Sequence, residues 1–318
     1  MKHFKILTVI ILSLWAGSLF AQQEPMYGQY LFNNTVINPA QAGANGINQW
    51  GILARNQWLG IDGAPRTETA FVNLRLPHQL GLSAGIYQDR LGPETNLQFQ
   101  TDLAYHARLS NYRYMSAGIR VIVNHTRLNL TGIPNVEPGD PYFQEDVSSG
   151  VLLNAGAGLL IYSEYSFWGI SIPKAFKNQI QIGENQGLDF TQRGARHVFI
   201  YGGVNLELSR EMLLTPSFLI KYSDNAPLQL DMNAMFNYNE VLDFGPLLRS
   251  NLIDINDWFD AVGFALGIRL SERWYLGYMY EYPLTDLVLA TRQTHEISLR
   301  FIWDTKQQRR IRSPRYFL

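Results

Sequence analysis

The residues of this sequence that could perform chemistry are few and widely spaced. Gly81-Leu82-Ser83-Ala84-Gly85 matches the G-x-S-x-G pattern, in which a sharp turn between a strand and a helix exposes a nucleophilic serine. Here the pattern lies inside an alternating stretch with no helical periodicity after it, so small residues in the wall of a sheet explain it better. Gly156-Ala157-Gly158 lacks the third glycine of a dinucleotide-binding loop and is also better explained by strand packing.

The possible metal ligands form no recognised binding pattern. Five of the six histidines lie beyond residue 21 and are scattered along the chain without an H-x-x-x-H pair: His78, His106, His125, His197 and His295. We expect them to form hydrogen bonds rather than bind zinc. Asp254, Asp257 and Asp260 could supply oxygen ligands to calcium, but a solvated loop is the simpler explanation. The absence of cysteine excludes disulfides and thiolate chemistry. We therefore predict no catalytic residue, no cofactor and no metal, and a protein that is not an enzyme.

The stretch from Leu228 to Asn239 shows the kind of element that must position these residues. Its apolar side chains alternate with mostly polar ones, so a strand here has one apolar and one polar face. A soluble β-sandwich could bury the apolar face in its core. A transmembrane barrel turns that face to lipid and the polar face to its lumen. The length of about twelve residues and the aromatic end at Phe236 and Tyr238 favour the membrane strand.

The same alternation predicts about fourteen strands, an even number as in bacterial single-chain barrels. We expect them at residues 47–57, 65–76, 80–91, 95–109, 112–128, 147–163, 165–173, 194–208, 211–223, 227–239, 241–251, 257–270, 273–283 and 293–303. Short connections such as Asn239-Glu240 alternate with long ones such as 129–146 and 174–192. Outer-membrane barrels have short periplasmic turns and longer outer loops. The sequence therefore predicts an all-β, transmembrane, antiparallel up-and-down barrel with both chain termini in the periplasm.

Composition and the N-terminal residues agree with export to an outer membrane. Charged residues make up only 17% of the chain and aromatic residues 13%, and the net charge of -1 gives no sign of nucleic-acid binding. Residues 1–21 have the charged start, apolar run and small-residue end of a secretory signal peptide. A signal anchor is the alternative, but the apolar run is shorter than the roughly 20 residues of a membrane-spanning helix.

These observations divide the chain into four expected regions. They are a signal peptide at residues 1–21, a periplasmic or lumenal segment at 22–46, the barrel at 47–304, and a basic periplasmic tail at 305–318. A barrel of about fourteen strands is too wide for small side chains alone to fill its lumen. Either loops plug the lumen or water enters it.

Two groups of residues are candidates for function. The first should point into the lumen, where the charges either pair across a closed barrel or stay solvated in a pore: Arg55, Arg66, Glu68, Lys221, Asp231, Arg249 and Glu296. The second lies in the basic, aromatic C-terminal tail: Arg312, Pro314, Arg315, Tyr316 and Phe317. This tail could be merely solvated, could dock a periplasmic component, or could be a signal for barrel assembly.

Several short motifs follow one another along the chain in a specific order and spacing. The N-terminal motifs are Gln29-Tyr30-Leu31-Phe32-Asn33, Asn38-Pro39-Ala40, Ala42-Gly43 and Arg55-Asn56-Gln57-Trp58-Leu59-Gly60-Ile61 with Gly63 and Pro65. The later motifs are His197-Val198-Phe199, Gly202-Gly203, Pro216-Ser217-Phe218-Leu219-Ile220-Lys221-Tyr222, Leu230-Asp231, Gly277-Tyr278 with Tyr280, His295-Glu296-Ile297 and Ser313-Pro314-Arg315-Tyr316-Phe317. In their order and spacing these motifs resemble those of the PorP/SprF family of Bacteroidetes membrane proteins. The resemblance covers essentially the whole mature chain. Thr294 departs from the serine or glycine that is usual in the family.

The resemblance implies an outer-membrane barrel of the type IX secretion system or the gliding machinery. Some members of the family contact periplasmic ring lipoproteins of that system, and others act with one large secreted adhesin in its export or surface attachment. We therefore expect three kinds of partner: outer-membrane lipid, periplasmic ring components and a secreted adhesin. Two alternatives stay open. The polar lumen face suggests a passive channel for small solutes, and Ser83 suggests an outer-membrane hydrolase.

Overall fold

Burial along the strands is the reverse of that in a soluble protein. In β14 (Ala226–Tyr238) the polar side chains of Gln229, Asp231 and Asn233 are buried, whereas the intervening Met232 is 42% exposed. Successive side chains of a strand point to opposite faces, so the enclosed face is the polar one. A barrel with a polar lumen and an apolar outer face has this pattern.

The computed structural model describes residues 28, 30, 33–133, 145–177, 179–182, 190–193, 195–224, 226–252, 258–285 and 293–303. The barrel strands are β1 (Asn48–Asn56), β2 (Arg66–Arg75), β3 (Leu80–Leu91), β4 (Glu94–Arg108), β5 (Arg113–Leu128), β7 (Leu152–Ser163), β8 (Ser166–Ile172), β11 (His197–Val204), β13 (Met212–Ser223), β14, β15 (Leu242–Asn251), β16 (Phe259–Arg269), β17 (Trp274–Pro283) and β18 (Thr294–Trp303). Two short strands, β6 (Val147–Ser148) and β12 (Leu206–Glu207), extend the pairing of β7 with β5 and of β11 with β13.

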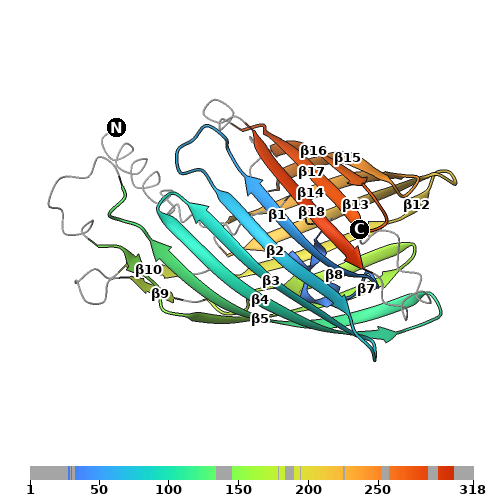
Figure 1. The fold of residues 1–318 in the computed structure, drawn as a ribbon, viewed down its shortest axis with the longest axis horizontal. Helices are drawn as coiled ribbons and strands as arrows, with labels where there is room; N and C mark the ends of the chain where they lie inside the picture. Colours follow the sequence, from blue (N-terminus) through green and yellow to red (C-terminus); the bar gives the residue numbers. More distant parts are fainter. Residues whose placement is uncertain are drawn as a thin grey trace, which may run out of the picture.

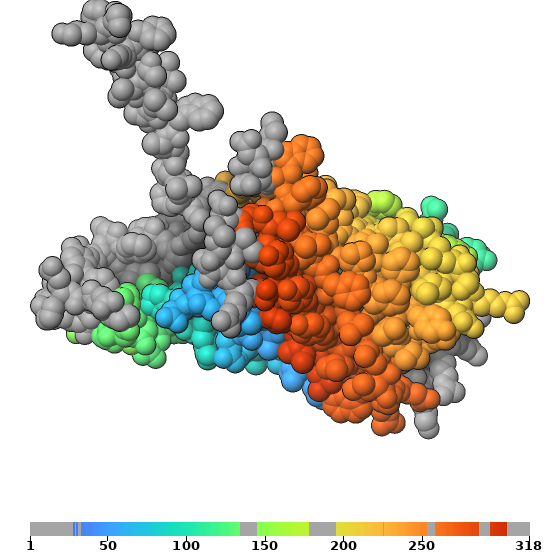
Figure 2. All heavy atoms as spheres, turned by 90° about the horizontal axis from the view of Figure 1, so that it is seen from above, coloured from blue at the N-terminus to red at the C-terminus, as the bar shows by residue number. Residues whose placement is uncertain are grey.

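These strands form one closed antiparallel barrel (Figure 1). Each barrel strand pairs with the next along the chain, and β11 pairs with β13 across the short β12. The barrel closes where β1 pairs with β18, in register from Asn48↔Trp303 to Asn56↔His295. Figure 2 shows the result on the surface, where the blue N-terminal strands adjoin the red C-terminal strand. The predicted antiparallel barrel of fourteen strands is confirmed.

The two ends of the barrel differ, because every connection at one end is a short turn, whereas the other end has the long connections and also two tight turns, β3–β4 and β13–β14. We call them the short-turn end, which carries the β2–β3, β4–β5, β7–β8 and β14–β15 turns, and the long-loop end, which carries the β5–β7, β8–β11 and β17–β18 connections. One element was not predicted. The hairpin of β9 (Gln179–Ile182) and β10 (Phe190–Arg193) begins in the predicted loop at 174–192, ends one residue after it, and extends beyond the long-loop end (Figure 1).

Serine begins several of the short turns and fixes their shape. The Oγ atom of Ser209 accepts hydrogen bonds from the backbone N–H groups of Glu211 and Met212, and Ser271 Oγ accepts from Arg273 and Trp274 in the same way. A hydroxyl that binds the backbone two or three residues ahead stabilises a tight reversal of the chain. The turn residues therefore help to set the register of the strands on either side.

The outer surface of the barrel is apolar and has aromatic residues near the ends of its strands. Trp274 and Tyr282 lie at the two ends of β17 and are 36% and 38% exposed, and Ile119, within β5, is 60% exposed. Aromatic side chains at the two interfaces and aliphatic ones between them are typical of a membrane-facing surface. No helix in the described part of the chain has the length and apolar character needed to cross a bilayer.

Candidate functional site in the barrel lumen

An N-terminal segment passes through the barrel lumen. We call its described residues (28, 30 and 33–46) the N-terminal plug. It contains two 3-10 turns, η2 (Asn34–Val36) and η3 (Pro39–Gln41). Pro39 suits the first position of η3, and the Asn38 side chain caps it by accepting a hydrogen bond from the Ala40 N–H at 2.8 Å. Every described residue from 38 to 46 is buried.

Arg120 on β5 joins the N-terminal plug to the barrel wall. Its guanidinium donates to both carboxylate oxygens of Asp102 on β4, from Nε at 2.6 Å and from Nη2 at 2.8 Å. Nη1 also donates to the Val36 carbonyl at 2.9 Å, and Nη2 donates to the Thr35 carbonyl. A bidentate carboxylate pair fixes the plane of a guanidinium. Asp102 therefore aims Arg120 at the end of η2.

Other barrel side chains bind the backbone carbonyls of the N-terminal plug. The contacts are Ser171 Oγ to the Ile37 oxygen (2.6 Å), Ser116 Oγ to the Ala40 oxygen (2.8 Å), His106 Nε2 to the Ala42 oxygen (2.8 Å) and Arg75 Nη1 to the Gly43 oxygen (3.3 Å). The carbonyls of Asn38, Pro39 and Gln41 accept from N–H groups within the plug. Each backbone carbonyl from residue 35 to 43 thus has a partner, and withdrawing the plug would leave buried polar groups unsatisfied.

Two glycines allow the plug to lie directly against the wall. A Cβ atom at Gly118 would overlap the backbone of Pro39 and Ala40, and one at Gly81 would overlap the carbonyl of Ala42. At these positions backbone meets backbone, and any larger residue would push the plug away from the strands. The glycine of the G-x-S-x-G pattern at position 81 therefore serves packing.

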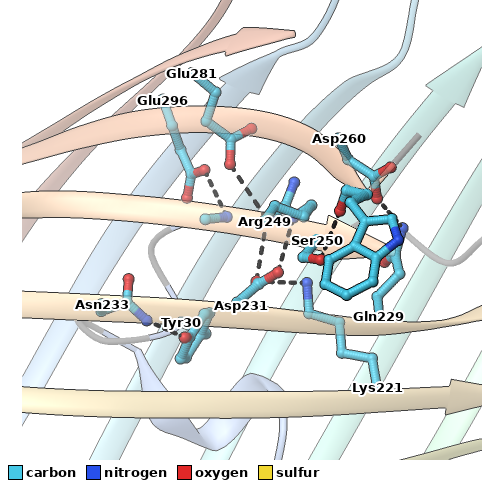
Figure 3. Close-up of polar contacts among 12 residues, drawn as sticks. Tyr30, Lys221, Gln229, Asp231, Asn233, Arg249, Ser250, Asp260, Glu281 and Glu296 are labelled. Atoms are coloured by element: carbon cyan, nitrogen blue, oxygen red, sulfur yellow. Dashed lines mark hydrogen bonds and ion pairs between the residues drawn. The ribbon is translucent and has the colours of Figure 1, made fainter. Parts of the chain in front are cut away.

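The other half of the lumen contains a chain of buried ion pairs. It runs Glu296–Arg55–Glu281–Arg249–Asp231–Lys221, with nitrogen–oxygen distances of 2.6, 2.6, 3.2, 2.9 and 2.6 Å. Figure 3 shows the part of this chain from Glu281 to Lys221. We call these six residues the ion-pair chain. They come from β18, β1, β17, β15, β14 and β13, and each side chain is 8% exposed or less. Three carboxylates and three cations alternate, so each buried charge lies beside at least one of opposite sign.

The plug and the ion-pair chain meet at the long-loop end. The backbone N–H of Gly28 donates to Glu296 Oε2 at 3.0 Å. Tyr30 is buried, and its hydroxyl accepts a hydrogen bond from the Asn233 side chain (Figure 3). The remaining plug residues bind strands β2 to β11, whereas the ion-pair chain belongs to strands β13 to β1. Together the two features occupy complementary sides of the lumen.

The structure places the sequence-predicted charges in two different environments. Five of them lie in the ion-pair chain: Arg55, Lys221, Asp231, Arg249 and Glu296.

Arg66 and Glu68 do not point into the lumen, and the prediction for these two residues is wrong. They pair with each other at 2.6 Å on the outer face of β2, with side chains 53% and 40% exposed, while the intervening Thr67 is buried. They lie near the long-loop end of the strand, where an outward charge can stay in water. The tail residues 312 and 314–317 lie outside the described residues.

The sequence analysis did not predict several residues of this site. Glu281 lies between Tyr280 and Tyr282 in the sequence, and this alternation is enough to predict that its side chain faces the lumen. The Arg120–Asp102 pair joins positions 18 residues apart on neighbouring strands, and only the strand register shows that they meet. No pattern in the sequence predicts the contacts between the plug and the barrel wall, because these contacts depend on the closed barrel.

The candidate chemistry of the sequence has a structural explanation in the described residues. Ser83 is buried within β3, whereas a nucleophile elbow needs a strand-to-helix turn. His106 binds the plug and also contacts the Tyr162 hydroxyl at 3.0 Å. Asp260 accepts a hydrogen bond from Gln229 at 3.1 Å. Within the described ranges, no three His, Asp or Glu side chains gather as they would to hold a metal ion.

Two solved structures share this fold. The CymD monoaromatic hydrocarbon channel is 10% identical, with a TM-score of 0.53 over 88% of this chain and 93% of its own. The toluene transporter TbuX of Ralstonia pickettii is 9% identical, with a TM-score of 0.51 over 85% of this chain and 93% of its own. At this identity the likeness shows the fold alone. No curated protein matches the sequence.

The family comparison identifies the chain more closely. The family described as "Type IX secretion system membrane protein PorP/SprF" matches residues 19–301, which include the plug and nearly the whole barrel. The matched range contains all six residues of the ion-pair chain as well as Arg120 and Asp102. This chain therefore belongs to the PorP/SprF family of type IX secretion system membrane proteins.

Proposed function

We propose that this barrel supports type IX secretion or gliding by binding proteins, including a secreted adhesin that it helps to export or attach to the cell surface. The observation that carries this proposal is the filled lumen. The N-terminal plug and the ion-pair chain take up the space that a solute channel would need, and both are held by buried hydrogen bonds and ion pairs. The remaining surfaces for function are the two ends and the lipid-facing wall. No covalent step is required of any residue.

A passive channel is the competing function, and conductance separates the two. Purified protein in a planar lipid bilayer should show no steady open current, because the plug and the ion-pair chain lie within the lumen. A porin of similar strand number, recorded in the same bilayers, provides the positive control. A stable ohmic conductance of the unmodified protein would support the channel and contradict the binding role.

Co-purification tests the binding role directly. The barrel, tagged in its own cells and solubilised in mild detergent, should recover either a periplasmic component of the secretion machinery or a large secreted protein. An unrelated outer-membrane barrel of the same cells, tagged in the same way, is the control. If both barrels recover the same set of proteins, the proposed role is wrong.

We also propose that the C-terminal tail lies in the periplasm and docks a component of the machinery there. The last described residue, Trp303, ends β18 at the short-turn end, which is the periplasmic end in barrels of this kind. Deleting residues 305–318 should abolish recovery of periplasmic partners while the folded barrel still reaches the membrane. Replacing Arg312 and Arg315 with glutamine should weaken recovery if their charges contribute. Unchanged recovery after the deletion would remove the tail from the proposal.

A further inference from the structure

Three arginines lie side by side on the outer face of the barrel, near its long-loop end. Arg66 on β2 is directly opposite Arg90 on β3, Arg90 is opposite Thr95 on β4, and Thr95 is opposite Arg127 on β5. The three arginine side chains are exposed. We call these four residues the arginine row. Because neighbouring strands are about 4.8 Å apart, the row extends over roughly 14 Å of the surface.

The arginine row lies beyond the end of the apolar surface of the wall. Four residues farther along the same faces of β2 to β5 is a second row in register, and all its members are apolar: Ala70, Ile86, Phe99 and Val123. Ile86 and Phe99 are 45% and 46% exposed, as expected of lipid-facing side chains. Four residues of a strand rise about 13 Å, and less along the membrane normal because barrel strands are tilted. The cations therefore lie at the depth of lipid headgroups.

Arg66 and Arg90 repel each other, since like charges at directly opposite positions destabilise an antiparallel pair. Gln88, whose side-chain amide faces the Arg90 guanidinium, is neutral and does not offset the charge. An anion between the two guanidiniums would remove the repulsion. Phosphate suits this position, because each guanidinium can donate two parallel hydrogen bonds to its oxygens.

Two carboxylates contact the arginine row, and both contacts are exposed. Glu68 pairs with Arg66 at 2.6 Å, and Asp146 pairs with Arg127 at 2.8 Å. The two arginine side chains are 53% and 61% exposed, so water and salt screen these pairs. Each contact is made by the Nη2 atom of a guanidinium that has five N–H donors. A phosphate can therefore bind the same arginines, with the carboxylates as weak competitors.

We propose that the arginine row binds the phosphorylated headgroup of a glycolipid in the outer leaflet of the outer membrane. The single phosphate of an ordinary phospholipid can engage only one neighbouring pair, Arg66 and Arg90. A headgroup with two phosphates also reaches Arg127, two strands beyond Arg90. Its acyl chains then lie along the apolar row at Ile86 and Phe99. The barrel orientation decides only which leaflet supplies the lipid, and binding does not depend on the secretion role.

Native mass spectrometry of the purified mature barrel in mild detergent measures binding during titration with diphosphorylated lipid A. Arg66→Gln combined with Arg90→Gln should lower the affinity about tenfold or more, because charge-assisted hydrogen bonds are lost. Arg210→Gln combined with Arg273→Gln is the matched control, since both arginines are exposed at the short-turn end, and it should leave the affinity unchanged. Glu68→Gln should raise the affinity by removing a competing carboxylate. The gel mobility of unheated protein shows that each variant is folded.

Three further probes identify the ligand. Lipid A without its phosphates should bind the unmodified barrel no more tightly than it binds the double variant at the arginine row. Phosphatidylglycerol and inorganic phosphate, each at a concentration equal to that of lipid A, should not displace it. Equal affinity of the unmodified barrel and this double variant for diphosphorylated lipid A, or an equal loss in the short-turn control, would overturn the proposed site. Displacement by phosphatidylglycerol or by inorganic phosphate would overturn the assignment to a glycolipid.

Discussion

Buried charge is the main feature of this protein at the scale of single residues. Arg55 lies between two carboxylates, Glu281 and Glu296, and its side chain is only 1% exposed. Removing one partner of a buried ion pair leaves an uncompensated charge in a low-dielectric site. A surface pair contributes little, because water and salt screen both charges. The same substitution should therefore have very different effects at Arg55 and at Arg66.

Arg55→Met should lower the free energy of unfolding by about 3–5 kcal/mol, because it leaves Glu296 without its cation. Urea unfolding of protein refolded into lipid vesicles, followed by tryptophan fluorescence, measures the change. Arg66→Met is the matched control and should cost no more than about 1 kcal/mol, since its pair with Glu68 is exposed. Adding Glu296→Gln to Arg55→Met should recover part of the loss. Equal effects of the two arginine variants would contradict the buried role of Arg55.

At the scale of elements, the tight turns fix the register of the barrel strands. Asn239 and Glu240 join β14 to β15 with φ values of 53° and 57°. Two successive positive φ angles match the twist of a two-residue hairpin, and Asn tolerates this region better than most residues. For Glu the left-handed region costs about 1–2 kcal/mol. The turn therefore contains one residue that is unfavourable for its conformation.

Glu240→Gly should raise the free energy of unfolding by about 0.5–1 kcal/mol, because glycine relieves the left-handed strain at some cost in chain entropy. Glu272→Gly is the control in the β16–β17 turn. Glu272 has no positive φ, so there the substitution should lower stability by roughly 0.5–1 kcal/mol. The same unfolding measurement serves both variants. Destabilisation by Glu240→Gly would show that its side chain contributes more than its conformation costs.

At the scale of the whole molecule, the barrel contains the N-terminal plug in its lumen. The plug contacts one side of the lumen and the ion-pair chain crosses the other, so neither feature alone fills the interior. Gly118 is the point at which the plug backbone lies directly on the wall. A side chain there must displace the plug or distort β5.

Gly118→Val should therefore produce measurable ion conductance in planar bilayers in which the unmodified protein is silent. Folding is checked by the mobility shift that intact barrels show in detergent gels without heating, and Gly118→Ala provides a milder variant. Gly150→Val is the control, because a Cβ atom at Gly150 meets nothing within 4 Å. A folded Gly118→Val protein that stays silent would show that the plug is not part of the seal.

Much of the fold follows from local sequence, and the misplaced residues show where local sequence is insufficient. Alternation predicts β14 and β17 and their faces, because successive side chains of a strand must point in opposite directions. The same rule did not place Arg66 and Glu68, since β2 has polar residues on both faces near its long-loop end. An outward charge is penalised only within the hydrocarbon layer, so the pattern weakens where the strand leaves it.

The sequence by itself determined the strands, their number, the polar lumen and the family, because each depends on short-range periodicity or on motif order. Only the tertiary structure decided how the lumen is filled. Gly28 and Glu296 are 268 residues apart and meet only when the last strand closes on the first. The pairing of Arg55 with Glu281 likewise requires the closed barrel, since no local pattern determines which charges on distant strands share one level of the lumen.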